Sequence, residues 1–445
     1  MAGEWLKVPA GDLFSYIAKG IPPVYAESNS DNAICVLNQK CNRNFEISFE
    51  DSRLHDISKR DVPREKILKE NDIIINSTGK GTAGRVAQIF DIDFPITVDG
   101  HMIIIRANEK IDPWYLGYAL KMQQPLIEQL AEGSTGQTEL NRQRLSSEIL
   151  VDYPKDLHEQ RIIAELFFAI DSRLYVNRMI SDHLEEIARA IFKHWFIDFE
   201  FPNENGDPYK SSGGEMIDSP LGPIPVGWRV GFINDIEFEI VPGDWGKGEL
   251  SERYSSPVRC IRGADIREIS SGGIGNPPLR YIKPLSAEVK SLRDTDVVVE
   301  ISGGSPTQQT GRAMRIIEPI TKKFAENLIC SNFCKLLRFR NIEDSEFTYF
   351  LLDNLYRREI MFQYENGTTG IKNLDFKNLF STEQVVIPNR KVLQQFAGYS
   401  RQIDSMIQLN GIQNMMLSRI RDSLLPKLMS GEIRVPVSDK EVDQL

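Results

Sequence analysis

The chain has 445 residues, of which 41% are hydrophobic and 26% are charged, a balance that excludes wholesale disorder, collagen and a small disulfide scaffold. Its 53 Lys and Arg against 63 Asp and Glu give a formal net charge of −10, which argues against a uniformly basic nucleic-acid binder, so that any DNA-binding surface must be a local basic region. At about 100–200 residues per domain, the length predicts two to four domains.

The cysteines and the first residues favour a cytoplasmic protein. The cysteine count is five, an odd number, and no pair has CxxC spacing, so we expect neither a disulfide framework nor a zinc ribbon. The start, MAGEWLKV, lacks the pattern of a signal peptide. No apolar run approaches the roughly 20 residues that a membrane span needs. We therefore expect a protein that binds no metal and no membrane.

Sequence matches divide the chain into two copies of one plan. The matches keep the same order through the chain, and their offset drifts by only a few residues. A repeat of this length is too long for a solenoid and predicts the tandem duplication of a domain. The matched pairs include Trp5 with Trp228, Asp72 with Asp296, Gly84 with Gly311, Leu140 with Leu374, and Asn177 with Asn410.

In the first copy, β-branched runs predict strands at 72–75 and 102–105, and a short helix is predicted at 114–122. Between the strands, Gly79–Gly84 matches GxGxxG, and Asp99 lies where a dinucleotide fold would place its acidic residue. The second copy does not keep this pattern, and the residues that follow predict a strand instead of a helix. We interpret the segment as a polar, glycine-rich turn.

A long helix follows each copy. Asp156 begins a D-x-x-E capping box, and an apolar seam then runs in alternating steps of four and three from Ile163 to Trp195. The second copy repeats the seam from Phe396 to Leu428. At about 40 residues, each helix is about 60 Å long. Two such helices, with no third, predict an antiparallel coiled coil.

Asn177 and Asn410 occupy the same position in the two seams. A buried Asn in a coiled coil costs stability but fixes the register, which predicts a spacer of defined length. The alternative is that each Asn is solvated at a loose point. Asn414 and Arg421 interrupt the second seam, so a regular zipper is less expected there.

The two copies are joined by a linker rich in Pro, Gly, Asn and Ser. In the second copy, strands are predicted at 296–300 and 335–339 and a short helix at 347–356. The predicted fold is α+β, with two tandem α/β domains separated by the two long helices and related by a pseudo-twofold duplication. Its parts are a first domain at 1–155, a helix at 156–199, a linker at 200–227, a second domain at 228–389, a second helix at 390–432 and a tail at 433–445.

The sequence offers no case for catalysis. Asn276–Leu279 resembles the NPPY/F motif of amino-methyltransferases, but its fourth residue is Leu and no glycine loop for S-adenosylmethionine accompanies it. Glu288–Lys290 is a lone ExK, which carries little information in a charged chain. There is no Walker A sequence and no readable nucleophile triad. The alternative interpretation of Asn276–Leu279 is an ordinary turn.

A local basic region points to binding instead. Residues 253–340 contain fifteen Lys and Arg and eight Asp and Glu, a net charge of 15 − 8 = +7, whereas residues 53–85 have 8 − 5 = +3. Polar loops at 77–85 and 302–312 occupy equivalent places but differ in side chains of the kind that read base edges. A turn-building role is the alternative for the polar residues of 133–141 and 367–373. The residues predicted to contact DNA are Lys80, Arg85, Thr138 and Asn141 in the first copy and Gln308, Gln309, Arg312, Lys372 and Asn373 in the second.

Over its full length the chain resembles the specificity subunit of Type I restriction-modification systems. Four segments carry the resemblance: HEQRII at 158–163, LEEIARAIFKHWFIDF at 184–199, LGPIPVGW at 221–228 and LLPKLMSGEIR at 424–434. The glycine loops at 133–140 and 367–374 are also similar to the family pattern.

The resemblance implies a prokaryotic, cytoplasmic and non-catalytic subunit with two target recognition domains, each reading half of a split site in double-stranded DNA. It also implies that the helices set the spacer and dock two methyltransferase subunits, which supply S-adenosylmethionine, and that motor-nuclease subunits using ATP and Mg²⁺ can join. Half-sites one DNA turn apart lie about 34–36 Å from each other, which helices of this length can bridge. Two alternatives stay open: a methyltransferase that uses Asn276–Leu279, and a coiled-coil scaffold without DNA contact.

Overall fold

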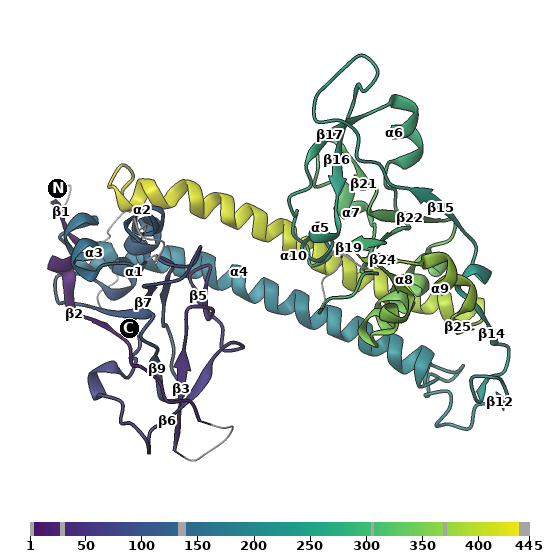
Figure 1. The fold of residues 1–445 in the computed structure, drawn as a ribbon, viewed down its shortest axis with the longest axis horizontal. Coiled ribbons are helices and arrows are strands. Elements are labelled where there is room, and N and C mark those ends of the chain that lie inside the picture. The colour runs from purple at the N-terminus through teal and green to yellow at the C-terminus, as the bar shows by residue number, and fades with distance from the viewer. Residues whose placement is uncertain (1–3, 27–31, 132–138, 304–306, 368–371, 436–445) are drawn as a thin grey trace. The chain divides into compact units, whose positions relative to one another are not determined.

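The computed structural model describes residues 4–26, 32–131, 139–303, 307–367 and 372–435. The chain forms two compact units, and two long helices pass from one into the other. Unit 1 comprises Met1–Ser172 and Ser418–Leu445, and unit 2 comprises Arg173–Leu417. Each unit therefore holds one globular domain together with part of both long helices (Figure 1).

The domain of unit 1 contains a four-stranded sheet in the order β2-β10-β7-β8, a three-stranded sheet in the order β6-β3-β9, and the pair β1-β11. Short helices complete it. The strands are β1 (Trp5–Pro9), β2 (Phe14–Lys19), β3 (Ala33–Leu37), β6 (Arg53–Asp56), β7 (Ile73–Asn76), β8 (Val86–Gln88), β9 (Ile96–Val98), β10 (Met102–Ala107) and β11 (Leu150–Pro154), and the helices are α1 (Pro113–Met122), α2 (Gln124–Leu130) and α3 (Arg142–Glu148).

The domain of unit 2 has the same three groups of strands: β15-β22-β18-β20, β17-β16-β21 and the pair β14-β25. It adds a small sheet, β19-β24-β23. The strands are β14 (Arg229–Phe232), β15 (Phe238–Pro242), β16 (Ser256–Ile261), β17 (Leu279–Ile282), β18 (Asp296–Glu300), β19 (Ser302–Gly303), β20 (Ala313–Arg315), β21 (Asn327–Cys330), β22 (Cys334–Phe339), β23 (Glu365–Asn366), β24 (Lys372–Leu374) and β25 (Gln384–Ile387). The helices are α5 (Gly263–Ser270), α6 (Pro284–Lys290), α7 (Glu318–Thr321), α8 (Ile342–Arg357) and α9 (Phe376–Thr382).

The strand order confirms the duplication that the sequence matches predict. Each strand of the three groups in unit 1 has a counterpart at the same place in unit 2. Even the one parallel pairing recurs, because β3 runs parallel to β9 and β16 runs parallel to β21. The strands predicted from β-branched runs are present in both domains. Their apolar residues, such as Ile73–Ile75 and Val297–Val299, are almost wholly buried, as a continuous apolar run predicts.

The long helix α4 (Leu157–Phe192) begins at the predicted aspartate. The Asp156 carboxylate accepts a hydrogen bond from the backbone N–H of His158 at 2.9 Å, which caps the first turn. The other half of the predicted capping box is wrong. Glu159 binds Arg434 with both carboxylate oxygens, at 2.8 and 3.0 Å, because this residue from the far end of the sequence lies beside the helix start in unit 1.

The helices α4 and α10 (Arg390–Met429) run antiparallel within unit 2. Asn177 faces Gln413 and Asn414, and farther along α4 the ring of Phe192 lies 5.8 Å from that of Phe396. Residue numbers therefore rise along one helix as they fall along the other. Beyond Phe192, the chain continues in a π-helical turn (Lys193–Ile197) that buries Trp195 in the domain core.

Arg421 does not break the seam of α10 as its charge suggests. Its guanidinium donates to Asp171 at 2.9 Å within unit 1, and Asp171 also pairs with Lys121 of α1 at 2.6 Å. Burial opposes ionisation of Asp171, but these two cations outweigh it and hold its pKa below the ordinary value. The interruption of the apolar pattern is thus a compensated ion cluster that joins both helices to the first domain.

The five cysteines are buried, and none forms a disulfide. In the ranges that the structure describes, no helix combines the length and the apolar character that crossing a membrane requires.

Candidate nucleic-acid interface

The two polar loops predicted in the first copy lie side by side. The backbone N–H of Leu140 donates to the carbonyl of Ser77 at 2.7 Å, and Thr78 and Glu139 form an antiparallel bridge. The loop that follows Thr78 is a tight turn in which Gly79 has a φ of +110°, a value that favours glycine. The segments 77–85 and 139–141 therefore belong to one surface.

The second copy builds the same arrangement with the same hydrogen bond. Leu374, the repeat counterpart of Leu140, donates its N–H to the carbonyl of Ile301 at 2.8 Å. Next to this bond, Ser302 pairs with Asn373 and Gly303 with Lys372 as short strands. Both domains thus present two polar loops at one equivalent place, although the side chains on them differ.

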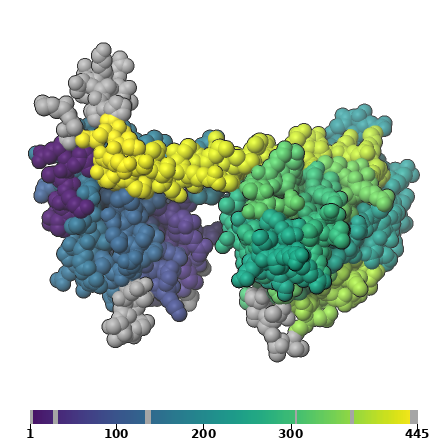
Figure 2. Space-filling model, turned by 90° about the horizontal axis from the view of Figure 1, so that it is seen from above, coloured from purple at the N-terminus to yellow at the C-terminus, as the bar shows by residue number. Residues whose placement is uncertain are grey.

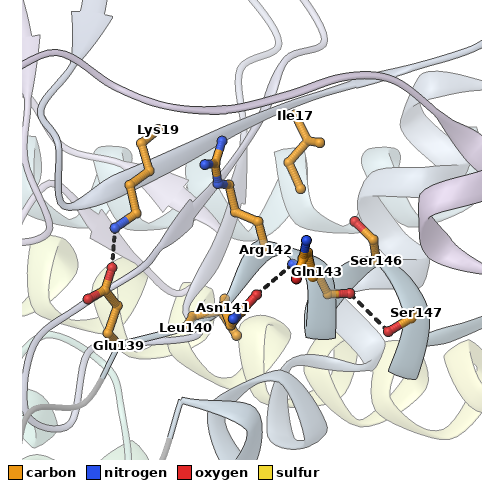
Figure 3. A pocket seen from close by; sticks show the side chains of 9 residues that line it. All are labelled: Ile17, Lys19, Glu139, Leu140, Asn141, Arg142, Gln143, Ser146 and Ser147. Atoms are coloured by element: carbon orange, nitrogen blue, oxygen red, sulfur yellow. Dashed lines mark hydrogen bonds and ion pairs between the residues drawn. The ribbon is translucent and has the colours of Figure 1, made fainter.

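An open cavity of about 840 Å³ adjoins the loops of the first domain (Figure 3). Lys19, at the end of β2, forms an ion pair with Glu139, and its ammonium holds the pKa of Glu139 below the ordinary value. Figure 3 shows the Arg142 side chain extending into the space between Lys19 and Ile17. The cavity is lined by Ile17, Lys19, Glu139, Leu140, Asn141, Arg142, Gln143, Ser146 and Ser147.

The predicted contact residues of the first domain are differently disposed. Lys80 is exposed at the loop, whereas Arg85 is half-buried and donates to the carbonyl of Gly81 at 3.0 Å. Asn141 is exposed, and its carbonyl oxygen caps α3 by accepting the N–H of Gln143 at 2.8 Å (Figure 3). This hydrogen bond is the turn-building role, and it uses the side-chain oxygen of Asn141 and not its amide nitrogen. Thr138 lies outside the described residues.

In the second domain, Gln308 differs in exposure from Gln309 and Arg312, the other predicted residues of its loop. Gln308 is exposed. Gln309 is only 6% exposed, and its amide donates to the carbonyl of Tyr356. Arg312 binds the buried Glu300 with two hydrogen bonds, of 2.9 and 2.8 Å. The placements of Gln309 and Arg312 favour support of the loop, and their contact with DNA stays a prediction.

Lys372 and Asn373 lie on β24. The Lys372 ammonium pairs with Glu365 at 2.8 Å and lies 4.6 Å from the centre of the Phe362 ring. Asn373 is exposed and accepts a hydrogen bond from the Ser302 hydroxyl at 2.5 Å. Of these two side chains, Asn373 is the one that faces outward.

Comparison with known proteins agrees with this geometry. Residues 3–188 match the family model described as Type I restriction modification DNA specificity domain. The chain is 26% identical over 352 residues to the Type I restriction enzyme MjaIX specificity subunit of Methanocaldococcus jannaschii, a match that covers 77% of this chain and 74% of that protein. Residues 3–188 therefore match a Type I restriction modification DNA specificity domain, and the chain is similar to a Type I specificity subunit over most of its length.

A second relative, the Type I restriction enzyme HindI specificity subunit of Haemophilus influenzae, is 22% identical over 436 residues, covering 84% of this chain and 89% of that protein. The chain also has the fold of the crystal structure of the Type I restriction-modification system S subunit from M. genitalium. Their TM-score is 0.57 at 16% sequence identity, and the match covers 98% of both chains. The matched domain of this chain is described as a DNA specificity domain, and the two relatives are named specificity subunits.

Two residues that line the cavity were not predicted from the sequence. Arg142 directly follows the predicted Asn141, so its position next to the loop was a usable signal. Lys19 lies 120 residues from its partner Glu139 and comes near the loop only because β2 is the edge strand of its sheet. No local pattern marks such a residue.

The basic region at 253–340 in the second domain is largely neutralised by neighbouring carboxylates. Eight of its fifteen cations form ion pairs with carboxylates, so its net charge overstates what is available to DNA. The paired residues are Arg259, Arg262, Lys290, Arg312, Arg315, Lys322, Arg338 and Arg340.

The segment Asn276–Leu279 lies in the connection between α5 and β17. The Asn276 N–H donates to Asp265 at 3.0 Å, and its carbonyl accepts from Arg262 at 2.8 Å. Both backbone groups of Asn276 are thus used to fix the local chain, as the turn interpretation predicts.

Proposed function

We propose that the chain reads a bipartite DNA site, with the domain at 1–155 contacting one half and the domain at 228–389 the other. One observation carries the proposal. Two domains of the same topology hold a pair of polar loops together through equivalent hydrogen bonds, at Leu140 and Leu374, but carry different side chains on those loops. A constant frame with divergent polar loops suits two readers of different sequences.

The contacts fall into two classes in this proposal. Exposed side chains of the loops read base edges or grip phosphates, and half-buried ones hold the loops in shape. Gln309 and Arg312 belong to the second class, because Tyr356 and Glu300 already occupy their donors. The first class comprises the exposed Lys80 and Asn141 in the first domain and the exposed Gln308 and Asn373 in the second. Arg85 and Lys372 are half-buried and Thr138 lies outside the described residues, so their contact with DNA stays a prediction.

The two helices set the distance between the half-sites in this proposal. Asn177 is fully buried and donates to Gln413 and Asn414, both at 2.8 Å, while Asn410 donates to Ser181 at 3.4 Å. In the repeat, Asn177 corresponds to Asn410 and Ser181 to Asn414, so the two contacts are counterparts. If one helix slid along the other by a turn, these polar side chains would face apolar ones and lose their hydrogen bonds. The polar pairs therefore favour one register, which supports a spacer of fixed length.

The helices also provide the docking surface for two methyltransferase subunits. Within unit 2, both helices expose large apolar side chains, and Figure 2 shows one side of α10 open to solvent. Such apolar rows on a helix are typical of a protein interface. The exposed residues are Tyr175, Val176, Met179, Ile180 and Ile187 of α4 and Tyr399, Met406, Leu409 and Met416 of α10.

In this arrangement the partners hold the cofactors. The methyltransferase subunits bind S-adenosylmethionine and methylate adenine, and restriction subunits that use ATP and Mg²⁺ join the complex to cut DNA. This chain determines the DNA sequence at which the complex acts, because its own residues supply the DNA contacts and a scaffold for the partners.

The test is to map methylated adenines in a host that expresses the methyltransferase partner with and without this chain. The expected result is a two-part motif with a spacer of constant length, present only with the chain. Exchanging residues 1–155 for the same domain of another specificity subunit should change one half of the motif and leave the other. A continuous motif, or methylation that does not depend on the chain, would contradict the proposal.

A further inference from the structure

Each domain carries an arginine stacked on an exposed aromatic ring. In the first, the guanidinium carbon of Arg53, an exposed residue, lies 4.8 Å from the centre of the Tyr25 ring. In the second, that of the half-buried Arg280 lies 4.5 Å from the ring of Trp245. Tyr25 is 46% exposed and Trp245 is 39% exposed.

The two stacks occupy equivalent places in the duplicated fold. Arg53 is on β6 and Arg280 on β17, which are the same outer strand of the three-stranded sheet. Each ring comes from the segment between the first strand of the four-stranded sheet and the middle strand of this sheet. In both domains that segment runs antiparallel beside the outer strand, through the bridges of Tyr25 with His55 and of Lys247 with Tyr281.

No sequence match connects these stacks. The offsets of the duplication do not place Tyr25 on Trp245 or Arg53 on Arg280, and one ring is a phenol and the other an indole. The two stacks are therefore built from different residues on the same strand of the duplicated sheet, two positions apart along it, since Arg53 lies opposite Val36 and Arg280 opposite Val258. The sheet that carries each stack lies on the side of its domain away from the long helices (Figure 1), which leaves the stack accessible.

Among the residues that the structure describes, neither arginine forms an ion pair, because no described carboxylate lies within 4.0 Å of the side-chain nitrogens of Arg53 or Arg280. The Nε of Arg280 donates a hydrogen bond to the carbonyl of Trp245 at 2.9 Å. This bond fixes the plane of the guanidinium, and the N–H groups of its two terminal nitrogens have no acceptor among the described residues.

More cations surround the second stack. The ammonium groups of Lys247 and Lys283 lie 5.9 and 6.0 Å from the centre of the Tyr254 ring. Glu249 and Glu252 share the exposed segment, but the described residues show no ion pair between them and these lysines. Cations that keep aromatic neighbours instead of carboxylates are suited to a phosphate ligand, since a stacked guanidinium is pre-organised and incompletely neutralised.

We infer that the Arg53–Tyr25 and Arg280–Trp245 stacks are equivalent DNA-backbone contacts, one in each domain and separate from the polar loops. The inference rests on the proposed function. Each stacked guanidinium donates to a phosphate, and the ring beneath it keeps the plane of the donors fixed and excludes water from one face. These contacts hold each domain on DNA without reading bases.

The experiment uses the complex of this chain with its methyltransferase partner and a duplex that contains the mapped target. Affinity is measured against salt for the wild type, Arg280→Ala, Trp245→Leu and Arg53→Ala. Arg340→Ala is the matched control, because Arg340 is exposed in the same domain but pairs with Glu237. Loss of one phosphate contact should weaken binding about tenfold. It should also reduce the slope of log affinity against log salt by about 0.9, leaving the methylated motif unchanged.

Trp245→Leu separates ligand contact from folding. It retains the arginine but removes the ring, so affinity should fall while the salt slope stays near that of the wild type, and the melting temperature should match that of Arg340→Ala. Salt slopes of Arg280→Ala and Arg53→Ala equal to the control would overturn the inference. So would a loss of partner assembly with unchanged DNA binding, which would assign the stacks to a protein surface. If the wild-type complex itself fails to bind its target, the proposed function fails instead.

Discussion

Arg106 and Asp72 form a two-pronged ion pair that Arg338 and Asp296 repeat in the second domain. The nitrogen–oxygen distances are 2.8 and 2.9 Å in the first domain and 3.1 and 3.0 Å in the second. In both, the arginine also donates to two backbone carbonyls in the segment that leads into the strand of the aspartate. This pair fixes the entry to β7 and β18, the strands that lead directly into the recognition loops.

Arg106→Met should destabilise the first domain by about 3–5 kcal/mol, because it leaves the buried Asp72 carboxylate and two carbonyls without their donor. Lys7→Met is the matched control: Lys7 pairs with Asp152 at 3.1 Å but is 58% exposed, so its loss should cost at most about 1 kcal/mol. Urea denaturation of both variants measures the difference. Equal losses would show that the buried pair is no stronger than the surface one.

Lys323 gives the second domain a pH dependence with a definite sign. Burial lowers the pKa of Lys323 to about 8, and Asp404 opposes the shift only in part. The unfolded chain holds this proton up to about pH 10.4, so between pH 8 and 10 the folded state binds fewer protons and the free energy of unfolding rises with pH. We expect the rise to be about 1–2 kcal/mol.

Lys323→Met should lack that rise. Its ammonium donates to the carbonyl of Gly272 and to Gln408 at 2.5 and 2.6 Å, so the variant also loses stability at every pH. The informative quantity is therefore the difference in unfolding free energy between wild type and variant, measured from pH 7 to 10. A difference that stays constant over this range would refute the assigned pKa.

Gln308 and Gln309 should differ in what their loss does. Gln308→Ala removes an exposed side chain and should relax only the second half of the methylated motif, by about 1–3 kcal/mol of discrimination. Gln309→Ala removes the donor to the Tyr356 carbonyl, so it should lower the melting temperature and weaken methylation of all sites alike. Motif mapping and thermal melts of both variants separate the two outcomes. If Gln308→Ala leaves the motif unchanged, its assignment as a base reader is wrong.

The frame of the molecule could be predicted because its signals are local or repeated. Continuous apolar runs gave the buried strands, and the alternating steps of four and three gave the seam from Ile163 to Trp195. The duplication then placed the two loop pairs in equivalent positions, where the hydrogen bonds of Leu140 and Leu374 lie.

The side-chain roles could not be predicted because they depend on partners far away in the sequence. Glu159 looked like the last residue of a capping box, yet its partner Arg434 is 275 residues distant. Gln309 is predicted from the sequence to contact DNA, and only the fold shows that its amide donates to the carbonyl of Tyr356, which favours support of the loop. The sequence does not distinguish a polar loop residue whose donors face solvent from one whose donors bind a buried carbonyl. Only the tertiary contacts show which of the two roles the residue has.

The apolar row on α10 gives a direct test of the docking proposal. Met406→Ala combined with Leu409→Ala removes side chains that are more than half exposed, so the isolated chain should keep its melting temperature. Binding of the methyltransferase partner should weaken by about 2–4 kcal/mol, since each buried side chain contributes about 1.5–3 kcal/mol. Gln402→Ala, an exposed polar change on the same face, is the control. Partner titration by calorimetry measures both, and equal affinities would remove this row from the interface.

Asn177 tests whether a polar contact sets the helix register. Asn177→Leu replaces a buried amide whose oxygen has no partner among the described residues, so it should raise the unfolding free energy by about 1–2 kcal/mol. If the amide fixes the register, the variant complex should also methylate sites whose spacer differs from that of the wild type. Asn410→Leu is the matched control, because Asn410 is half-buried and its single bond to Ser181 is long, at 3.4 Å. It should change both quantities less. A stabilised Asn177→Leu variant that keeps the wild-type spacer would show that apolar packing alone determines the register.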